Sequence, residues 1–385
     1  MRAGRHLSVL GTLVAMLAAG PALAQEQEPI KIGVTQPLTG AFAASGNYVA
    51  QGAKLAEEDI NAAGGVLGRK IQLIVEDNKS NPTEAVATAE KLTQKDKVPV
   101  MMGAWSSTLT LAVMPKLMEY EVPMLVETSS SSKITTSGNP WIFRISPTSE
   151  MEAKAFAPMV KTLGIKKADL LGTNNDFGLG AMQEFAKMLK ASGAAVGVQE
   201  TMDPKAVDFS AQLAKIKASG GDTLFVTSDV SQVTVILKQA KEQQIKARII
   251  TTGGSVSPDQ LIAQAGEAAN GSMHLVFFTP WFPDAVKNPD IASKFVKAWN
   301  AKGYNVGGLT EGFRGYDGIT TIVAGIKAAG VAEPKAIQKA LWGVKVHGVN
   351  GDIAFIKQGP AGQESAQNVP SVYLVKIAGG KVTKM

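Results

Sequence analysis

Apolar residues follow two alternating spacings along the chain. Residues 30–36 (IKIGVTQ) form a short apolar run, whereas residues 46–65 place apolar side chains three or four positions apart and end in two glycines. The first spacing predicts a buried strand, and the second predicts a helix with a glycine stop. A helix over 81–95 would have Asn81 as its cap and Pro82 in its first turn. This alternation predicts a doubly wound, mainly parallel α/β sheet with helices on both faces.

The alternation occurs twice, which predicts two lobes. Strand-like and helix-like segments from residue 30 to the stretch FRISPTSE (143–150) are matched, unit for unit, by those between that stretch and about residue 280. The last part, from about residue 276, contains helical segments but is too short for a third lobe. We therefore expect it to add helices and strands to the first two lobes.

The first 24 residues have the features of a secretory signal peptide. Arg2 and Arg5 precede the apolar run LSVLGTLVAML, and the small residues ALA end at Ala24. The apolar run is too short to span a membrane, and the segment has no cysteine for a lipid anchor. We therefore expect cleavage near Ala24 and a periplasmic location.

Composition and charge exclude several classes of protein. The chain has no cysteine, which excludes disulfides and thiolate metal sites. Its formal net charge is +6, but the basic side chains are scattered, so the sequence does not indicate a nucleic-acid surface. Beyond the leader only His274 and His347 remain, and no GxSxG, HExxH or GxxxxGK[ST] motif occurs. The sequence favours a binding protein without metal or cofactor over an enzyme.

Polar residues stand where the predicted strands end. In open α/β sheets, ligands bind beyond the carboxyl ends of the strands. Hydroxyls, amides and glycines at these ends suit a small polar ligand that lies between facing lobes. The loops concerned are 37–45, 106–108 and 128–132 in the first lobe and 174–178, 227–229 and 251–255 in the second.

The hydroxyls of Ser106, Ser107 and Thr108 allow two interpretations. They lie between a strand-like segment and a helix-like segment. Serine and threonine are favoured helix caps, which is the structural interpretation. A helix start can also hold an anion, and the five similar loops elsewhere in the chain favour this second interpretation.

The sequence resembles the leucine/isoleucine/valine-binding branch of ABC-transporter solute-binding proteins. The resemblance rests on the leader, the opening motif PLTG…INAAGGVLGRK, the GAWSS turn, NNDFGLG and VNGDIAFIKQG, and it covers the whole mature chain. It implies two doubly wound parallel-sheet lobes joined by three hinge crossings, the type I periplasmic binding protein fold. It also implies that the lobes close on a solute and deliver it to permease and ATPase subunits at the inner membrane.

The resemblance also implies where the lobes begin and end. The hinge crossings are expected near residues 144–147, 279–283 and 352–357. The first lobe would then comprise residues 28–146 plus about 281–353. The second lobe would comprise 147–280 plus about 354–385. We expect a monomer whose lobes close around the ligand.

Several ligand contacts are implied by the resemblance, residue by residue. The serine that binds an amino-acid carboxylate falls on Ser107, and further hydroxyl and main-chain contacts fall on Thr128 and Ser130. The aromatic residue that covers the ligand from the second lobe falls on Phe177. An aromatic residue is also implied in the first loop, but the position falls near Ser45, which is not aromatic.

The main departure from the family pattern is Gly253. The resemblance implies a glutamate there to pair with the ligand ammonium, and a buried ammonium without a partner costs several kcal/mol. Asp229, or less favourably Glu127 or Asp176, could replace it; otherwise the ligand has no ammonium. The candidate ligand-binding residues are Ser45, Ser106, Ser107, Thr128, Ser129, Ser130, Phe177, Asp229 and Gly253.

The sequence leaves two questions of function open. The solute can be an amino acid or a related organic acid, and amides or aromatic acids without an amino group are the alternative. The same closed cleft would also serve a periplasmic protein that signals to a sensor instead of a permease. We expect the solute to be a small carboxylate-bearing molecule in either case.

Overall fold

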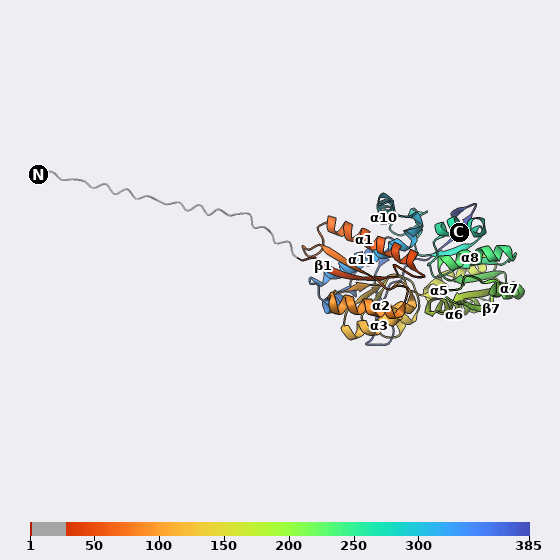
Figure 1. Ribbon diagram of the computed structural model, residues 1–385, viewed down its shortest axis with the longest axis horizontal. Helices are drawn as coiled ribbons and strands as arrows, with labels where there is room; N and C mark the ends of the chain where they lie inside the picture. The colour runs from red at the N-terminus through yellow and green to blue at the C-terminus, as the bar shows by residue number, and fades with distance from the viewer. Residues whose placement is uncertain (2–27) are drawn as a thin grey trace.

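The computed structural model describes Met1 and residues 28–385, so the expected signal peptide lies outside the described residues. Two lobes lie side by side, with α1, α2, α3 and α11 on one and α5, α6, α7 and α8 on the other (Figure 1). Between residues 28 and 385, no helix combines the length and the apolar character that a membrane crossing requires.

The first lobe is built around a sheet of seven strands in the order β13-β14-β5-β4-β3-β1-β2. All neighbours are parallel except the edge hairpin β13–β14. The strands are β1 (Ile30–Gln36), β2 (Ile71–Asp77), β3 (Met101–Met102), β4 (Met124–Val126), β5 (Ile142–Arg144), β13 (Ile356–Gln358) and β14 (Ser365–Gln367). The helices of this lobe are α1 (Ala43–Ala62), α2 (Pro82–Glu90), η1 (Lys91–Lys95), α3 (Ser107–Tyr120), α4 (Lys133–Thr136), α10 (Pro289–Ala301), η4 (Val306–Gly308), α11 (Leu309–Ala329) and α12 (Pro334–Leu341).

The second lobe repeats this arrangement with the order β16-β15-β10-β9-β8-β6-β7. Strands β6 to β10 are parallel to one another, and β15 and β16 add an antiparallel edge. The strands are β6 (Lys167–Thr173), β7 (Ala195–Met202), β8 (Thr223–Thr227), β9 (Arg248–Thr251), β10 (Met273–Val276), β15 (Tyr373–Ala378) and β16 (Lys381–Lys384). The helices are α5 (Ser149–Thr162), α6 (Asp176–Ala191), α7 (Ser210–Ser219), α8 (Val230–Glu242), α9 (Pro258–Ala265) and η2 (Gly266–Ala269). The matching strand orders confirm the predicted doubly wound fold with two equivalent lobes.

Apolar packing explains why the central strands read as continuous hydrophobic runs. Ile32 and Val34 of β1 are fully buried, because α1 and α11 cover one face of the sheet and α2 and α3 cover the other. In the second lobe, Leu170 and Leu171 of β6 point into two different clusters. Parallel sheets covered on both faces have this pattern.

The chain passes between the lobes after β5, after β10 and after β14. The first two passages follow β5 and β10, which end at Arg144 and Val276, and the resemblance implied crossings near residues 144–147 and 279–283. The third was expected near residues 352–357, and this expectation was wrong. The short hairpin β11 (Val346–Gly348) and β12 (Gly351–Ile353) comes first, and β14 then pairs in parallel with β5. The chain therefore stays in the first lobe until Asn368 and crosses between residues 369 and 372.

The stretch that caused this error is the hairpin of β13 and β14. Gln367 is fully buried, where its side chain accepts a hydrogen bond from Arg144 Nε at 2.6 Å and donates to the carbonyl of Ser146 at 2.8 Å. These bonds fix β14 to the edge of the first sheet. The sequence of β14, SAQ, is polar and short, so its hydrophobic pattern gave no sign of a strand.

Candidate functional site

Loops from the carboxyl ends of both sheets meet between the lobes and line one pocket, here called the cleft. Eight of the nine candidate residues named from the sequence line it, and Ser45 is the exception. The cleft is lined by Phe42, Trp105, Ser106, Ser107, Thr128, Ser129 and Ser130 from the first lobe and by Thr173, Asn175, Phe177, Asp229, Gly253 and Ser255 from the second. Parallel strands bring these loops together because all their carboxyl ends lie at the same edge of the sheet.

The start of α3 has free hydrogen-bonding capacity. Ser106 occupies the N-cap position, but its side chain makes no capping hydrogen bond. The hydroxyl oxygen of Ser107 accepts a hydrogen bond from the backbone N–H of Ser131 at 3.1 Å. Its proton therefore remains available to donate into the cleft. Helix capping thus does not explain the Ser106 side chain, and the helix start is open to an anion.

The loop after β4 supplies a second set of hydroxyls. The Thr128 hydroxyl is buried and has no hydrogen-bond partner among the described residues. Ser130 lies 3.4 Å, oxygen to oxygen, from the Ser149 hydroxyl. Ser129 differs, because its hydroxyl bonds to Thr110 at 2.8 Å and to the carbonyl of Trp105 at 2.9 Å. Ser129 therefore supports the wall, while Thr128 lines the cleft and has a buried hydroxyl beside the Glu127 carboxyl, whose pKa it helps to lower.

Two aromatic residues of the first lobe line the cleft, and sequence reasoning missed the role of both. The rings of Phe42 and Trp105 lie 4.9 Å apart between centroids. The expected aromatic position near Ser45 was wrong, because α1 begins at Ala43 and Ser45 is buried inside its first turn. Phe42 is the N-cap residue of that helix instead. The signal was present in the sequence, since Phe42 is an aromatic residue in the predicted ligand loop.

Phe177 and Gly253 are packed directly against each other on the second lobe. A Cβ atom at position 253 would lie 2.3 Å from Cε2 and Cζ of the Phe177 ring. The backbone of Gly253 also has a φ of +84°, which side chains rarely tolerate. The ring therefore occupies the space that a side chain at position 253 would need. No carboxylate can be placed there without moving Phe177.

The three carboxylates considered as replacements lie in different places. Asp229 lines the cleft, but its Oδ1 already caps α8 by accepting from the backbone N–H groups of Ser231 and Gln232. Asp176 accepts a hydrogen bond from the Thr108 hydroxyl at 3.1 Å and pairs with Lys133, and it does not line the cleft. Glu127 accepts from Gln36 Nε2 at 2.9 Å and lines a different cavity. Asp229 is therefore the carboxylate that a ligand in the cleft can reach.

Charge around the cleft is arranged so that buried carboxyls lie behind its walls. Burial raises the pKa of Glu127 to about 7 and that of Glu152 to about 8. The Glu152 side chain accepts a hydrogen bond from the backbone N–H of Gly253 at 2.6 Å. No lysine, arginine or histidine is among the cleft residues. An anion in the cleft would depend on hydroxyls, backbone N–H groups and the positive end of α3.

The side chains that could bind a metal ion in the described part of the chain are those of histidine, aspartate and glutamate. Among residues 28–385, no group of three or more histidine, aspartate or glutamate side chains is placed to hold a metal ion. His274 is fully buried between the hydroxyls of Thr251 and Ser272, each 2.8 Å from a ring nitrogen, and burial lowers its pKa to about 3. This histidine is a core residue of the second lobe.

Comparison with known proteins agrees with this arrangement. Residues 29–381 match the periplasmic binding protein family. The Leu/Ile/Val-binding protein BraC3 of Rhizobium johnstonii is 30% identical and aligns with 87% of this chain and 88% of its own length.

Two solved structures with 26% identity have the same fold. The branched-chain amino acid substrate-binding protein LivJ of Streptococcus pneumoniae, in complex with isoleucine, has a TM-score of 0.81, over 92% of this chain and 98% of that one. An ABC-transporter solute-binding protein of Rhodopseudomonas palustris, in complex with 3,4-dihydroxybenzoic acid, has a TM-score of 0.80, over 93% and 96%. The chain therefore belongs to the periplasmic binding protein family, in the Leu/Ile/Val-binding branch that its motifs indicated.

Proposed function

We propose that this protein is the periplasmic solute-binding component of an ABC importer, and that its solute is a small carboxylate with an apolar or aromatic body. The family membership supports the solute-binding role. The chemistry of the cleft supports the ligand class, and the packing of Phe177 against Gly253 is the observation that carries it.

The carboxylate end of the solute has a defined place in the first lobe. Ser107 can donate its hydroxyl proton, and the Thr128 hydroxyl makes no geometric hydrogen bond within the protein. The first turn of α3 has no side-chain cap, and the N–H groups of a first turn have no partner within the helix. Hydrogen bonds to a charged acceptor are stronger than those between neutral groups. These groups together would hold a carboxylate without a positively charged side chain.

The body of the solute would contact aromatic rings. Phe42 and Trp105 lie on the first-lobe wall, and Phe177 lies on the facing wall. A flat apolar or aromatic body packs well between such rings. A side chain at position 253 is excluded by Phe177, so an α-amino group would find no carboxylate there. We infer that the amino group contributes little to binding.

The relatives support a branch that takes ligands of both kinds. One relative of known structure holds isoleucine and another, at the same identity, holds 3,4-dihydroxybenzoic acid. Identity alone therefore does not choose between an amino acid and an acid without an amino group. For this chain we prefer the second, because of the occupied space at Gly253.

Calorimetry with matched pairs tests the proposal. Leucine is compared with 4-methylpentanoate, and phenylalanine with 3-phenylpropanoate, benzoate and 3,4-dihydroxybenzoate. We expect the acids to bind as tightly as the amino acids or more tightly. If the amino acids bind a hundredfold more tightly than the matching acids, and Asp229→Asn abolishes this preference, Asp229 is the partner of the ligand ammonium. That outcome would overturn the proposed ligand class. Binding of neither series would contradict the proposed function.

Export, partners and oligomeric state are further parts of the proposal. We propose cleavage of the leader near Ala24, a monomer in the periplasm, and delivery of the solute to permease and ATPase subunits. Sensing through a receptor is the second candidate, because a closed cleft serves either partner. Solute uptake by membrane vesicles that contain the cognate permease, with and without this protein, separates transport from sensing.

A further inference from the structure

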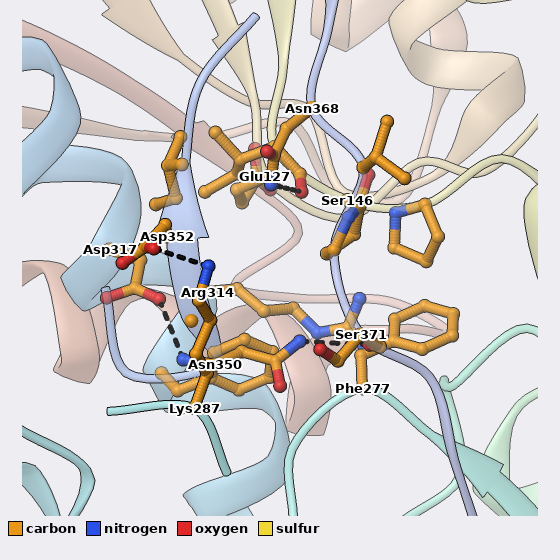
Figure 2. A pocket seen from close by; sticks show the side chains of 17 residues that line it. Glu127, Ser146, Phe277, Lys287, Arg314, Asp317, Asn350, Asp352, Asn368 and Ser371 are labelled. Atoms are coloured by element: carbon orange, nitrogen blue, oxygen red, sulfur yellow. Dashed lines mark hydrogen bonds and ion pairs between the residues drawn. The ribbon is translucent and has the colours of Figure 1, made fainter. Parts of the chain in front are cut away.

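A second cavity lies where the chain crosses between the lobes (Figure 2). Its wall includes Ser146 from the first crossing, Phe277 from the second and Ser371 from the third. Arg314 of α11 also lines it, and Figure 2 shows its side chain close to the middle of the group. We call this space the hinge cavity.

Arg314 belongs to the first lobe but holds a loop of the second. Helix α11 packs along α1 and contributes Ile319 and Ile322 to the core of the first lobe. The guanidinium of Arg314 nevertheless donates from Nη2 to the carbonyl of Gly254 at 2.5 Å. Gly254 follows Gly253, so the bond reaches the loop that lines the cleft opposite the hydroxyl wall.

The Gly253–Gly254 loop is held by its backbone from two sides. Glu152 of the second lobe accepts the N–H of Gly253, and Arg314 of the first lobe donates to the C=O of Gly254. The loop cannot be fixed by side chains of its own. A Cβ at either position would collide with an aromatic ring, Phe177 in one case and Phe277 in the other.

The Arg314 guanidinium is itself oriented by the first-lobe wall of the cleft. Its Nε lies 3.4 Å from an oxygen of Glu311, and the same oxygen accepts a hydrogen bond from the indole N–H of Trp105 at 3.3 Å. Trp105 lines the cleft. The guanidinium also lies over the rings of Phe277 and Phe313, at 5.1 Å and 5.6 Å from their centroids. A chain of contacts thus runs from one cleft wall to the other through Arg314.

The polar groups near Arg314 are not fully matched in the described residues. Glu127, Glu152 and Glu311 are electrostatically coupled to this one guanidinium, and each is at most 1% exposed and keeps one oxygen without a hydrogen-bond partner. Burial raises the pKa of all three carboxyls, which favours their neutral forms. Arg314 also keeps one nitrogen, Nη1, without a partner. Buried polar groups that lack partners are costly. This cluster combines groups of both lobes, so it is assembled in this form only when the lobes are close together.

We infer that Arg314 is a positioning residue for the cleft: from the first lobe it holds the carbonyl of Gly254, and so fixes Gly253 beneath Phe177, when the lobes close. This inference rests on the proposed function, since it assumes that a solute binds between the lobes. Arg314 does not line the cleft, so the inference gives helix α11 an indirect role in solute affinity. Opening of the lobes breaks the bond between Arg314 and Gly254.

Arg314→Lys and Arg314→Met test the inference, with three measurements on each. Calorimetry gives the Kd of the acid that the wild type binds most tightly. Energy transfer between dyes at Val207→Cys and Val331→Cys, which are exposed positions in the second and first lobes, gives the fraction of closed molecules. The chain has no cysteine of its own, so labelling is specific. Melting without solute reports the stability of the fold. Lys335→Met, which removes an exposed cation paired with Glu121, is the matched control.

Arg314→Met is expected to weaken binding about a hundredfold and to reduce the closed fraction, because it removes a charged donor. Arg314→Lys keeps the charge but not the reach of the guanidinium, so a loss of about tenfold is expected. Lys335→Met is expected to change neither property. A purely structural role would give lower melting temperatures with an unchanged Kd and an unchanged closed fraction, and would overturn the inference. If Arg314→Met does not fold, the Kd and the closed fraction of Arg314→Lys decide whether the inference holds.

Failure of the proposed function is distinguishable from failure of this inference. A wild type that binds none of the acids and amino acids contradicts the proposed function. The closed fraction of the solute-free protein then decides the role of Arg314. A lower closed fraction in Arg314→Lys than in the wild type supports the role, and equal fractions overturn it.

Discussion

The two walls of the cleft are built from equivalent loops, yet they differ in how their helix starts are used. Strands β3 and β8 hold the same place in the two sheets, and each leads into a helix at the cleft. Asp229 caps α8 with its own carboxylate, whereas the side chain of Ser106 makes no cap at the start of α3. The start of α8 is therefore already capped by the protein itself, whereas the start of α3 is free to hold a ligand anion.

The walls also differ in what fixes their shape. On the first wall, hydrogen bonds between side chains, such as that of Ser129 with Thr110, hold the loop and leave Ser107 and Thr128 free. On the second wall, Gly253 and Gly254 themselves are held by their backbone and by the rings that cover them. The neighbouring side chains of Thr252 and Ser255 fix the two ends of this segment through bonds to Thr227 and Ser228. The difference indicates that the first wall supplies binding energy and the second wall sets the shape of the site.

The largest effect is expected when a side chain is forced into the second wall. Gly253→Glu would place its Cβ 2.3 Å from the Phe177 ring and strain a backbone with a φ of +84°. We expect more than about a hundredfold loss of affinity for carboxylates, because the ring must leave the cleft wall. Calorimetry measures the loss. Tighter binding of leucine by this variant would show that Phe177 moves aside easily and that the second wall is adaptable.

A double-mutant cycle sharpens this first prediction. Gly253→Ala should lower the affinity more in the wild-type protein than in a protein that already carries Phe177→Ala. The reason is that the clash with the ring is absent in the second background. Equal costs in the two backgrounds would mean that backbone strain, and not Phe177, excludes a side chain at this position.

The next effect concerns the first wall, at Ser107. Ser107→Ala removes a hydroxyl that is free to donate to a carboxylate, which should cost about 1.5–3 kcal/mol, or roughly tenfold to a hundredfold in affinity. Ser129→Ala is the matched comparison, because the Ser129 hydroxyl is already used within the protein. That variant should lower the melting temperature more than Ser107→Ala does. An unchanged Kd for Ser107→Ala would remove this residue from the site.

Stability should depend on pH through the carboxyl that supports the second wall. Burial raises the pKa of Glu152 from its ordinary value of 4.5 to about 8, against the opposing effects of the Gly253 N–H and Arg314. Between these two pH values the folded protein keeps a proton that the unfolded chain has lost. Stability therefore falls as pH rises across this window. Glu127 and Asp317, with a pKa of about 7 each, act in the same direction.

Glu152→Gln isolates this effect. The amide oxygen can still accept the Gly253 N–H but does not titrate. We expect equal stability of the variant and the wild type near pH 5, and an advantage of about 1–3 kcal/mol for the variant near pH 8. Denaturant unfolding at both pH values measures the difference. If the free energies of unfolding of the variant and the wild type differ by the same amount at both pH values, the pKa of Glu152 in the folded protein is near its ordinary value.

The sequence predicted the fold and most of the cleft because both follow from strand order. Once the strands are parallel, their carboxyl ends meet, so Ser107, Thr128 and Gly253 could be placed together without a structure. Phe42 was missed because it depends on where α1 begins. The predicted start at residue 46 made Ser45 the loop residue, but the helix begins at Ala43.

Other features could not be predicted because they depend on contacts that are distant in the sequence. Position 46 in the first turns of α1 requires glycine, because a Cβ there would lie 2.2 Å from the carbonyl oxygen of Pro37. In the sequence, Arg314 has the pattern of an ordinary helix residue. Its hydrogen bond to Gly254 could not be predicted, because the two residues are 60 positions apart. The third crossing was misplaced because β14 is held by polar bonds of Gln367 and not by an apolar pattern.

The smallest effect is expected at the rim, where the two walls touch. Asp176 of the second lobe contacts Thr108 and pairs with Lys133 of the first, at 3.3 Å between Nζ and Oδ1. The Lys133 side chain is 73% exposed, and exposed ion pairs contribute only about 0–1 kcal/mol. Asp176→Asn keeps an acceptor for Thr108 but removes the charge, so we expect less than about a threefold loss of affinity. Raising the salt concentration should shrink even this loss, since salt screens exposed pairs but not buried ones. A tenfold loss that persists at high salt would mean that the rim, and not the buried contact of Arg314 with Gly254, holds the lobes together.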